Sequence, residues 1–143
     1  MATSTSTAST QWKGSLMEGS GETALETSGL TTFDLTWGKR TGPGPDNTNP
    51  EELIAAAYAS CYSMQLSHGL SEDGFVPEAI NTRVSVDFNP EQGGITGIKL
   101  SVHGIVPNMA FEDFKKKAEW AKDTCPVGKA LSALNRQLEV VDS

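Results

Sequence analysis

Residues 48–64 of this 143-residue chain, TNPEELIAAAYASCYSM, carry its strongest structural signal. Asn49 can cap a helix, Pro50 suits its first position, and Glu52 stands three residues after Asn49 to complete a capping box. The segment that follows is apolar nearly all round, which is typical of a helix buried on most sides. The stretch therefore predicts a long buried helix, and this helix carries Cys61.

Segments of alternating apolar residues on both sides of this helix predict strands. We expect strands at 11–16, 22–27, 32–37, 81–89, 95–106 and 137–141, helices at 111–122 and 126–134, and a Gly/Pro-rich loop at 38–47. Strands and helices are segregated and do not alternate strictly, which favours an α+β fold. The expected organisation is a flexible Ser/Thr-rich tail at 1–10, followed by a single domain at 11–143.

Composition narrows the class of protein. The net charge of −7 argues against a nucleic-acid partner, and we interpret Lys115, Lys116 and Lys117 as the solvated face of a helix. No apolar run reaches the ~18 residues of a membrane span. The first residues lack a basic and an apolar signal region, so we expect a cytoplasmic protein.

The two cysteines, Cys61 and Cys125, are the residues with the clearest chemistry. A buried cysteine in a helix is often only a small apolar filler, but the Cys125-Pro126 helix start favours a thiolate. The pair could form a structural disulfide, or one thiol could attack a peroxide while the other closes a disulfide behind it. The spacings of His68 and His103 argue against a metal site.

Two motifs resemble those of a known superfamily. Residues 48–64 and the run AKDTCPV at 121–127 are similar to the two cysteine motifs of the osmotically inducible protein C (OsmC) and organic hydroperoxide resistance (Ohr) proteins, closer to the OsmC branch. The resemblance spans residues 11–141. It implies two antiparallel sheets around a long buried central helix in an intertwined homodimer.

The resemblance also implies a function. It is thiol-dependent reduction of organic hydroperoxides, and more weakly of hydrogen peroxide, in oxidative and osmotic stress defence. No cofactor is implied, and the reductant would be a dithiol such as a lipoylated protein. Two alternatives stay open: a non-catalytic binding module with idle cysteines, and a structural dimer whose disulfide only staples the chain.

Roles for individual residues follow from the same resemblance. Cys61 matches the peroxidatic position, Cys125 the resolving position and Glu51 the helix-start glutamate. The activating cation comes from the loop after the third strand, where we assign Arg40, with Lys39 as the alternative. A guanidinium near a buried thiol favours its thiolate, and a glutamate can hold that guanidinium through a bidentate pair.

Three further residues on the predicted helix, Tyr58, Tyr62 and Met64, are candidates for the substrate approach, with a core role as the alternative. Ten helical residues span about 15 Å, so Glu51 and Cys61 of one straight helix are far apart. Antiparallel pairing of two such helices would bring Glu51 of one chain towards Cys61 of the other. We therefore expect a composite site at the dimer interface.

Overall fold

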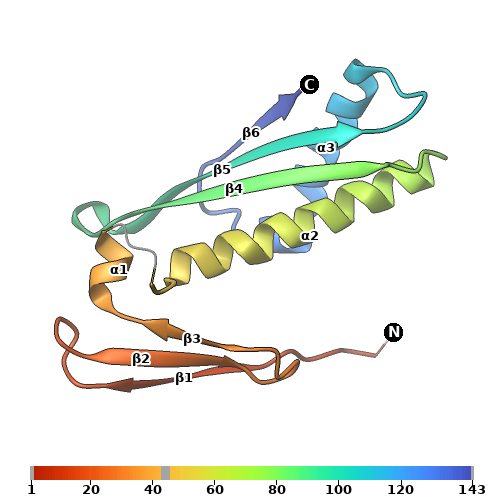
Figure 1. Ribbon diagram of the computed structural model, residues 1–143. Helices are drawn as coiled ribbons and strands as arrows, with labels where there is room; N and C mark the ends of the chain where they lie inside the picture. Colours follow the sequence, from red (N-terminus) through yellow and green to blue (C-terminus); the bar gives the residue numbers. More distant parts are fainter. Residues whose placement is uncertain (1, 43–45, 143) are drawn as a thin grey trace. The chain divides into compact units, whose positions relative to one another are not determined.

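The computed structural model describes residues 2–42 and 46–142, which form two compact units, one ending at Pro50 and the other beginning at Glu51. Each unit is described by itself (Figure 1). The first unit holds β1 (Ala8–Lys13), β2 (Ser20–Leu25), β3 (Thr32–Leu35) and α1 (Trp37–Thr41). The second unit is built from α2 (Pro50–Glu72), whose first residue closes the first unit, then β4 (Ala79–Asn89), the 3-10 turn η1 (Pro90–Gln92), β5 (Gly94–Ile105), α3 (Phe111–Thr124), α4 (Pro126–Ala130) and β6 (Arg136–Val141).

The first unit is the expected antiparallel meander, with strand order β1-β2-β3. Its first strand begins at Ala8, so three residues expected in a flexible tail are paired with β2 instead. Among the described residues of this unit, Thr23 alone is buried. Its hydroxyl lies 2.6 Å from that of Thr10 on β1. This sheet therefore buries very little within one chain.

The segment after β3 differs from the prediction of an irregular loop, because residues 37–41 form the short helix α1. The prediction weighted the glycines and prolines, which disfavour helix. One turn forms nevertheless, because Gly42 N–H donates to the Gly38 carbonyl at 3.0 Å and the Asn49 side chain donates to the Lys39 carbonyl at 3.1 Å. The rest of the predicted loop, residues 43–45, lies outside the described residues.

The second sheet has strand order β4-β5-β6. β4 and β5 form the predicted antiparallel hairpin, and Gly93 at its turn has φ 94°, a conformation that glycine adopts without strain. β6 pairs with β5 in parallel, so the expectation of two purely antiparallel sheets is wrong for this pair. The physical reason is the crossover through α3 and α4, which brings the chain back to the end of the sheet where β5 began. The α+β class is confirmed.

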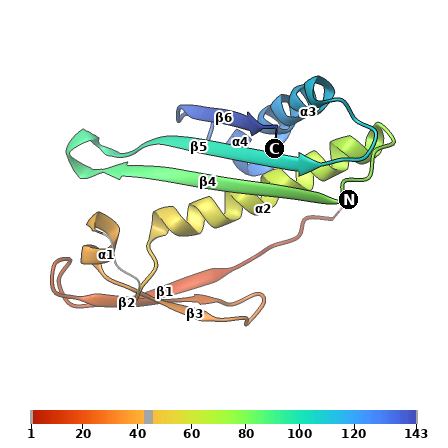
Figure 2. The same cartoon turned by 45° about the horizontal axis from the view of Figure 1, so that its top comes forward.

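The hydrophobic core lies between this sheet and the two long helices. Alternation along β5 puts Ile98, Leu100 and Val102 on one face, and all three are buried. α2 and α3 pack on these side chains, and α2 runs along the sheet in both views (Figures 1 and 2). The helical members of the cluster are Tyr58, Tyr62, Leu66, Leu70, Phe114, Ala118 and Ala121.

Helix α2 begins at Pro50, as the sequence predicts, and continues without a break to Glu72. Within one chain it buries one face, whereas Met64 on the other side is 73% exposed. A helix that is apolar on an exposed side has surface left for a further partner. No helix among the described residues combines the length and the apolarity needed to cross a membrane.

Candidate redox site

The two cysteine side chains meet in the second unit. Cys61 lies in the middle of α2, and Cys125 is the residue that joins α3 to α4. Both are free thiols, and the Cys125 thiol donates a hydrogen bond to the Cys61 sulfur across 3.1 Å. A disulfide bond is about 2.05 Å long, so the sulfurs need to approach by only about 1 Å to form one.

The two sulfurs differ in their access to solvent. Cys125 is 0% exposed, whereas Cys61 is partly exposed. Burial raises the pKa of the Cys125 thiol, and the hydrogen bond to Cys61 raises it further, while the backbone N–H groups of Gly128 and Val127 act in the opposite direction. The raised pKa keeps the Cys125 thiol protonated at neutral pH, as its role as hydrogen-bond donor requires.

Hydrogen bonds hold α2 against the end of α3. Tyr62 Oη donates to the Ala118 carbonyl at 2.8 Å in the buried core. Three residues farther along α2, Gln65 donates to the Thr124 hydroxyl at 2.8 Å. Both bonds reach α3 before it ends at Cys125, so they hold the second half of α3 against the part of α2 that follows Cys61.

A third brace comes from Arg136, the first residue of β6, which sequence reasoning missed. Its Nη1 donates to Tyr58 Oη at 2.9 Å and to the Lys122 carbonyl at 3.2 Å. The sequence does contain a signal, because Arg136, Leu138 and Val140 alternate and a strand puts such residues on one face. Leu138 and Val140 pack against the core, which places Arg136 on the same side.

Comparison with known proteins identifies the family of this chain. The family model described as OsmC-like protein matches residues 42–139. Peroxiredoxin OsmC of Escherichia coli is 37% identical over 124 residues, covering 85% of this chain and 86% of the relative. This chain belongs to the OsmC-like family.

Two further likenesses agree with this OsmC-like membership. The organic hydroperoxide resistance protein OhrB of Bacillus subtilis is 30% identical over 104 residues, covering 71% of this chain and 75% of the relative. The crystal structure of an organic hydroperoxide resistance protein OsmC from Legionella pneumophila superposes with a TM-score of 0.74 at 26% identity. That likeness covers 98% of each chain.

The expected site residues of this OsmC-like chain fall into both units. Cys61, Cys125, Tyr58 and Tyr62 lie together in the second unit. Glu51 opens that unit at the start of α2 and is buried. Arg40 belongs to the first unit, so only its surroundings within that unit are described.

Those surroundings form an apolar pocket of about 480 Å³ within the first unit. The Arg40 guanidinium stands 6.0 Å from the centre of the Trp37 ring. The other lining residues are Trp12, Gly14, Leu16, Leu35, Thr36 and Pro50. Arg40 thus combines a positive charge with an apolar cavity, whereas Lys39, the alternative cation, pairs with Asp46 at 3.9 Å.

The three residues expected at the substrate approach differ in their exposure. Tyr58 and Tyr62 are both 0% exposed, and their hydroxyls are engaged with Arg136 and the Ala118 carbonyl. Burial raises the pKa of both tyrosines, so both stay protonated at physiological pH. Only Met64 faces solvent. Contact of these residues with a substrate stays a prediction.

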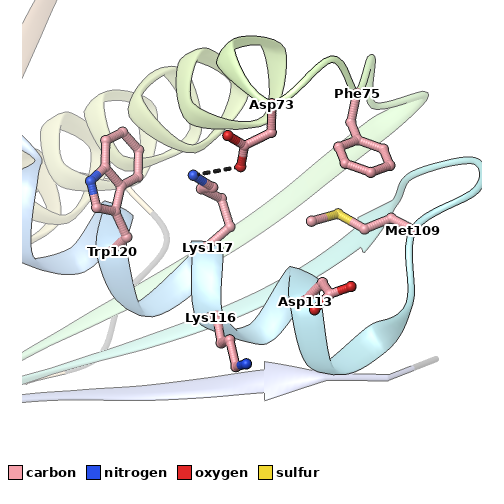
Figure 3. Close-up of a pocket in the computed structure, with 7 residues that line it drawn as sticks. All are labelled: Asp73, Phe75, Met109, Asp113, Lys116, Lys117 and Trp120. Atoms are coloured by element: carbon pink, nitrogen blue, oxygen red, sulfur yellow. Dashed lines mark ion pairs between the residues drawn. The ribbon is translucent and has the colours of Figure 1, made fainter.

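A second hollow of about 440 Å³ lies away from the sulfurs, between the end of α2 and α3 (Figure 3). The Lys117 ammonium group pairs with Asp73 at 2.7 Å and stands 4.9 Å from the Trp120 ring. Of the lysine run expected on a solvated helix face, Lys115 and Lys116 are exposed, while Lys117 is half-buried in this ion pair.

Histidine and metal chemistry contribute little to the description of the site. His68 is exposed and lies 3.8 Å from Glu72, one helical turn away. His103 is half-buried on β5, so both histidines lie on the surface or in a strand, as expected. Among the described residues, no group of three or more His, Cys, Asp or Glu side chains is arranged to hold a metal ion.

Proposed function

We propose that this protein is a thiol-dependent peroxidase that reduces organic hydroperoxides, and hydrogen peroxide more weakly, in defence against oxidative and osmotic stress. Its enzyme class is that of the peroxidases, since the E. coli relative is named a peroxiredoxin and the B. subtilis relative is named for organic hydroperoxide resistance. The observation that carries the mechanism is the unequal pair of free thiols 3.1 Å apart, one partly exposed and one buried.

The chemistry has two steps. The Cys61 thiolate attacks one peroxide oxygen, the O–O bond breaks, and the alkoxide leaves with a proton as an alcohol, which converts Cys61 to sulfenic acid. The Cys125 sulfur then attacks the Cys61 sulfur and expels the hydroxyl group as water, which forms the disulfide. Each cysteine sulfur supplies one of the two electrons that the peroxide takes up.

A reductant must then reopen the disulfide. We assign this role to a dithiol, such as a lipoylated protein, because thiol–disulfide exchange needs two thiols to release both cysteines. No cofactor enters the proposal. The cytoplasm is the proposed compartment, because it keeps such thiols reduced.

Activation of Cys61 is assigned to Arg40, held by Glu51. Cys61 and Glu51 lie on one continuous helix, where ten residues span about 15 Å. This separation supports a composite site in an intertwined homodimer, in which Glu51 of one chain serves Cys61 of the other. The low burial of the first unit and the exposed side of α2 also favour a partner chain.

The first test counts free thiols before and after one equivalent of cumene hydroperoxide. The expected result is the loss of both thiols in the wild-type chain, with mass spectrometry locating the new bond between Cys61 and Cys125. The Cys61→Ser variant should keep its remaining thiol. Thiols that survive the peroxide would overturn the proposal, and they would favour the binding module with idle cysteines.

The stapling alternative makes a different prediction. A structural disulfide would resist the dithiol reductant and stay oxidised during isolation, whereas a catalytic one cycles. Repeated additions of peroxide and dihydrolipoamide should therefore oxidise and reduce the pair many times. A single oxidation that dihydrolipoamide does not reverse would favour the staple.

The composite site is tested by mixing two inactive variants. Cys61→Ser chains and Glu51→Ala chains are unfolded together and refolded. In a mixed dimer, the intact Cys61 of one chain meets the intact Glu51 of the other, so part of the activity should return. If mixed dimers form and no activity returns, both residues must come from the same chain.

A further inference from the structure

The environment of Arg136 points to a role beyond packing. Its Nη1 joins two elements, because it donates to Tyr58 Oη on α2 and to the Lys122 carbonyl at the end of α3. The last carbonyls of a helix lack partners within the helix, and a cationic side chain there satisfies one of them and complements the helix dipole. Arg136 therefore caps α3 three residues before Cys125.

The same guanidinium also packs over α4. A Cβ atom at Gly128 would come within 2.8 Å of Arg136 Nη1 and 2.9 Å of Tyr58 Oη, so the bridge fits only above a glycine. Gly128 is buried, and its backbone N–H is one of the nearby groups that act to lower the pKa of the Cys125 thiol. One side chain thus fixes the residues before and after Cys125.

Backbone hydrogen bonds define the turn that carries Cys125, in addition to the Gln65–Thr124 bond just before it. Cys125 N–H donates to the Ala121 carbonyl, and the Cys125 carbonyl accepts from Lys129 N–H, both at 2.9 Å. The Cys125 side chain is set by where α3 stops and where α4 begins. Arg136 contacts both of these points and ties them to α2, the helix that carries Cys61.

We propose that Arg136 is a positioning residue for the resolving thiol. By bridging Tyr58 and the Lys122 carbonyl over Gly128, it keeps the Cys125 sulfur within bonding reach of Cys61, so that the disulfide closes before a second peroxide oxidises Cys61 further. This role rests on the proposed function. Arg136 acts through Tyr58 and the backbone and takes no part in cleaving the peroxide.

The test separates the two chemical steps in the full chain. In Arg136→Met, which keeps a side chain of similar length without donors, sulfenate formation on Cys61 should stay within about twofold of wild type. Closure of the disulfide should slow about tenfold, because the two sulfurs lose their preorganised geometry. In Arg136→Met, the Cys61 sulfenate should last long enough to be trapped. It should then be oxidised to sulfinic acid at peroxide concentrations that the wild type tolerates.

A second readout needs no peroxide. Equilibration with mixtures of oxidised and reduced dithiothreitol gives the equilibrium constant for the Cys61–Cys125 disulfide. We expect Arg136→Met to lower this equilibrium constant about tenfold. The value for Arg136→Lys, which keeps one donor group, should lie between those of the wild type and Arg136→Met. Arg83→Met, which removes an exposed guanidinium from β4 of the same sheet, is the matched control and should change nothing.

Tyr58→Phe keeps the test decisive if Arg136→Met fails to fold, because it removes only the hydroxyl and retains the ring. It should shift both readouts in the same direction as Arg136→Met by about threefold. Closure rates and dithiothreitol equilibria that match wild type in every folded variant would overturn the positioning role. Thiols inert to peroxide, together with an equilibrium that depends on Arg136, would sink the peroxidase proposal and leave the positioning role standing.

Discussion

The two units of this chain differ in what holds them together. In the second unit, side chains from α2, β5 and α3 form a continuous buried cluster, and Cys125 is one of its members. In the first unit, the described residues bury only Thr23, and the strand β1 is exposed along its whole length. A three-stranded sheet without an apolar core is marginal in water, so burial within the first unit contributes little to its stability.

This difference suggests that the two units have different roles. The second unit supplies a rigid frame, in which buried hydrogen bonds set the positions of the two sulfurs. In the proposed mechanism the first unit supplies Arg40, which lines an apolar pocket of that unit. This contrast between the two units leads to the following testable predictions.

The largest effect is expected from Cys61→Ser. Removing the nucleophile should lower the turnover of cumene hydroperoxide by about 10³-fold or more. Cys125→Ser should still form the Cys61 sulfenate at a near wild-type rate, measured by trapping with dimedone. Equal loss of the first step in both variants would contradict the assignment of attacking and resolving thiols.

The difference in burial predicts that truncating a leucine destabilises the chain more in the second unit than in the first. Leu66→Ala, in the core of the second unit, should lower the free energy of unfolding by about 2–5 kcal/mol. The same change at Leu30, which is 79% exposed in the first unit, should stay within about 0.5 kcal/mol. Urea unfolding of the reduced proteins measures both, and similar losses would contradict the contrast between the units.

Arg40→Met should lower peroxidase activity and leave the equilibrium of the cysteine pair unchanged. We expect kcat/KM for cumene hydroperoxide to fall about tenfold to a hundredfold, because the variant loses the cation that we propose favours the Cys61 thiolate. The dithiothreitol equilibrium of the cysteine pair should remain as in wild type, since Arg40 lies outside the unit that frames it. Lys39→Met is the matched control, and an equal loss there would move the activating role to Lys39.

The smallest effect concerns pH. The pKa of the Cys125 thiol is raised above its ordinary value of 9.0, so in the folded chain it keeps a proton that the unfolded chain releases. The unfolded state then binds fewer protons above about pH 9, and the free energy of unfolding of the reduced protein falls as pH rises from there through the folded pKa. Tyr58 and Tyr62, whose pKa values are raised from 10.0, add to this loss at higher pH.

Comparing the slopes of unfolding free energy against pH in wild type and Cys125→Ala isolates this contribution. The variant should have the flatter profile between about pH 9 and 10, whatever its absolute stability. Parallel slopes would mean that the Cys125 thiol is not shielded in the folded chain.

Local sequence signals were sufficient for most of the fold. The start of α2 at Pro50, the alternation along β4 and β5 and the Cys-Pro start of α4 all depend on neighbours in the chain, and the structure confirms these elements. The errors concern features that distant residues control. The helical turn at 37–41 depends on Asn49, and the parallel pairing of β6 depends on the crossover through α3 and α4.

The same division applies to the candidate site. Sequence patterns alone show two cysteines in recognisable motifs and predict that one of them lies on a long apolar helix. Three features depend on tertiary packing: the sulfurs lie 3.1 Å apart, Cys125 is the buried one, and Arg136 donates a hydrogen bond to the last turn of α3. The reason is physical: motifs record local backbone preferences, whereas burial and hydrogen bonds between residues 64 to 78 positions apart arise only when the helices and the last strand pack together.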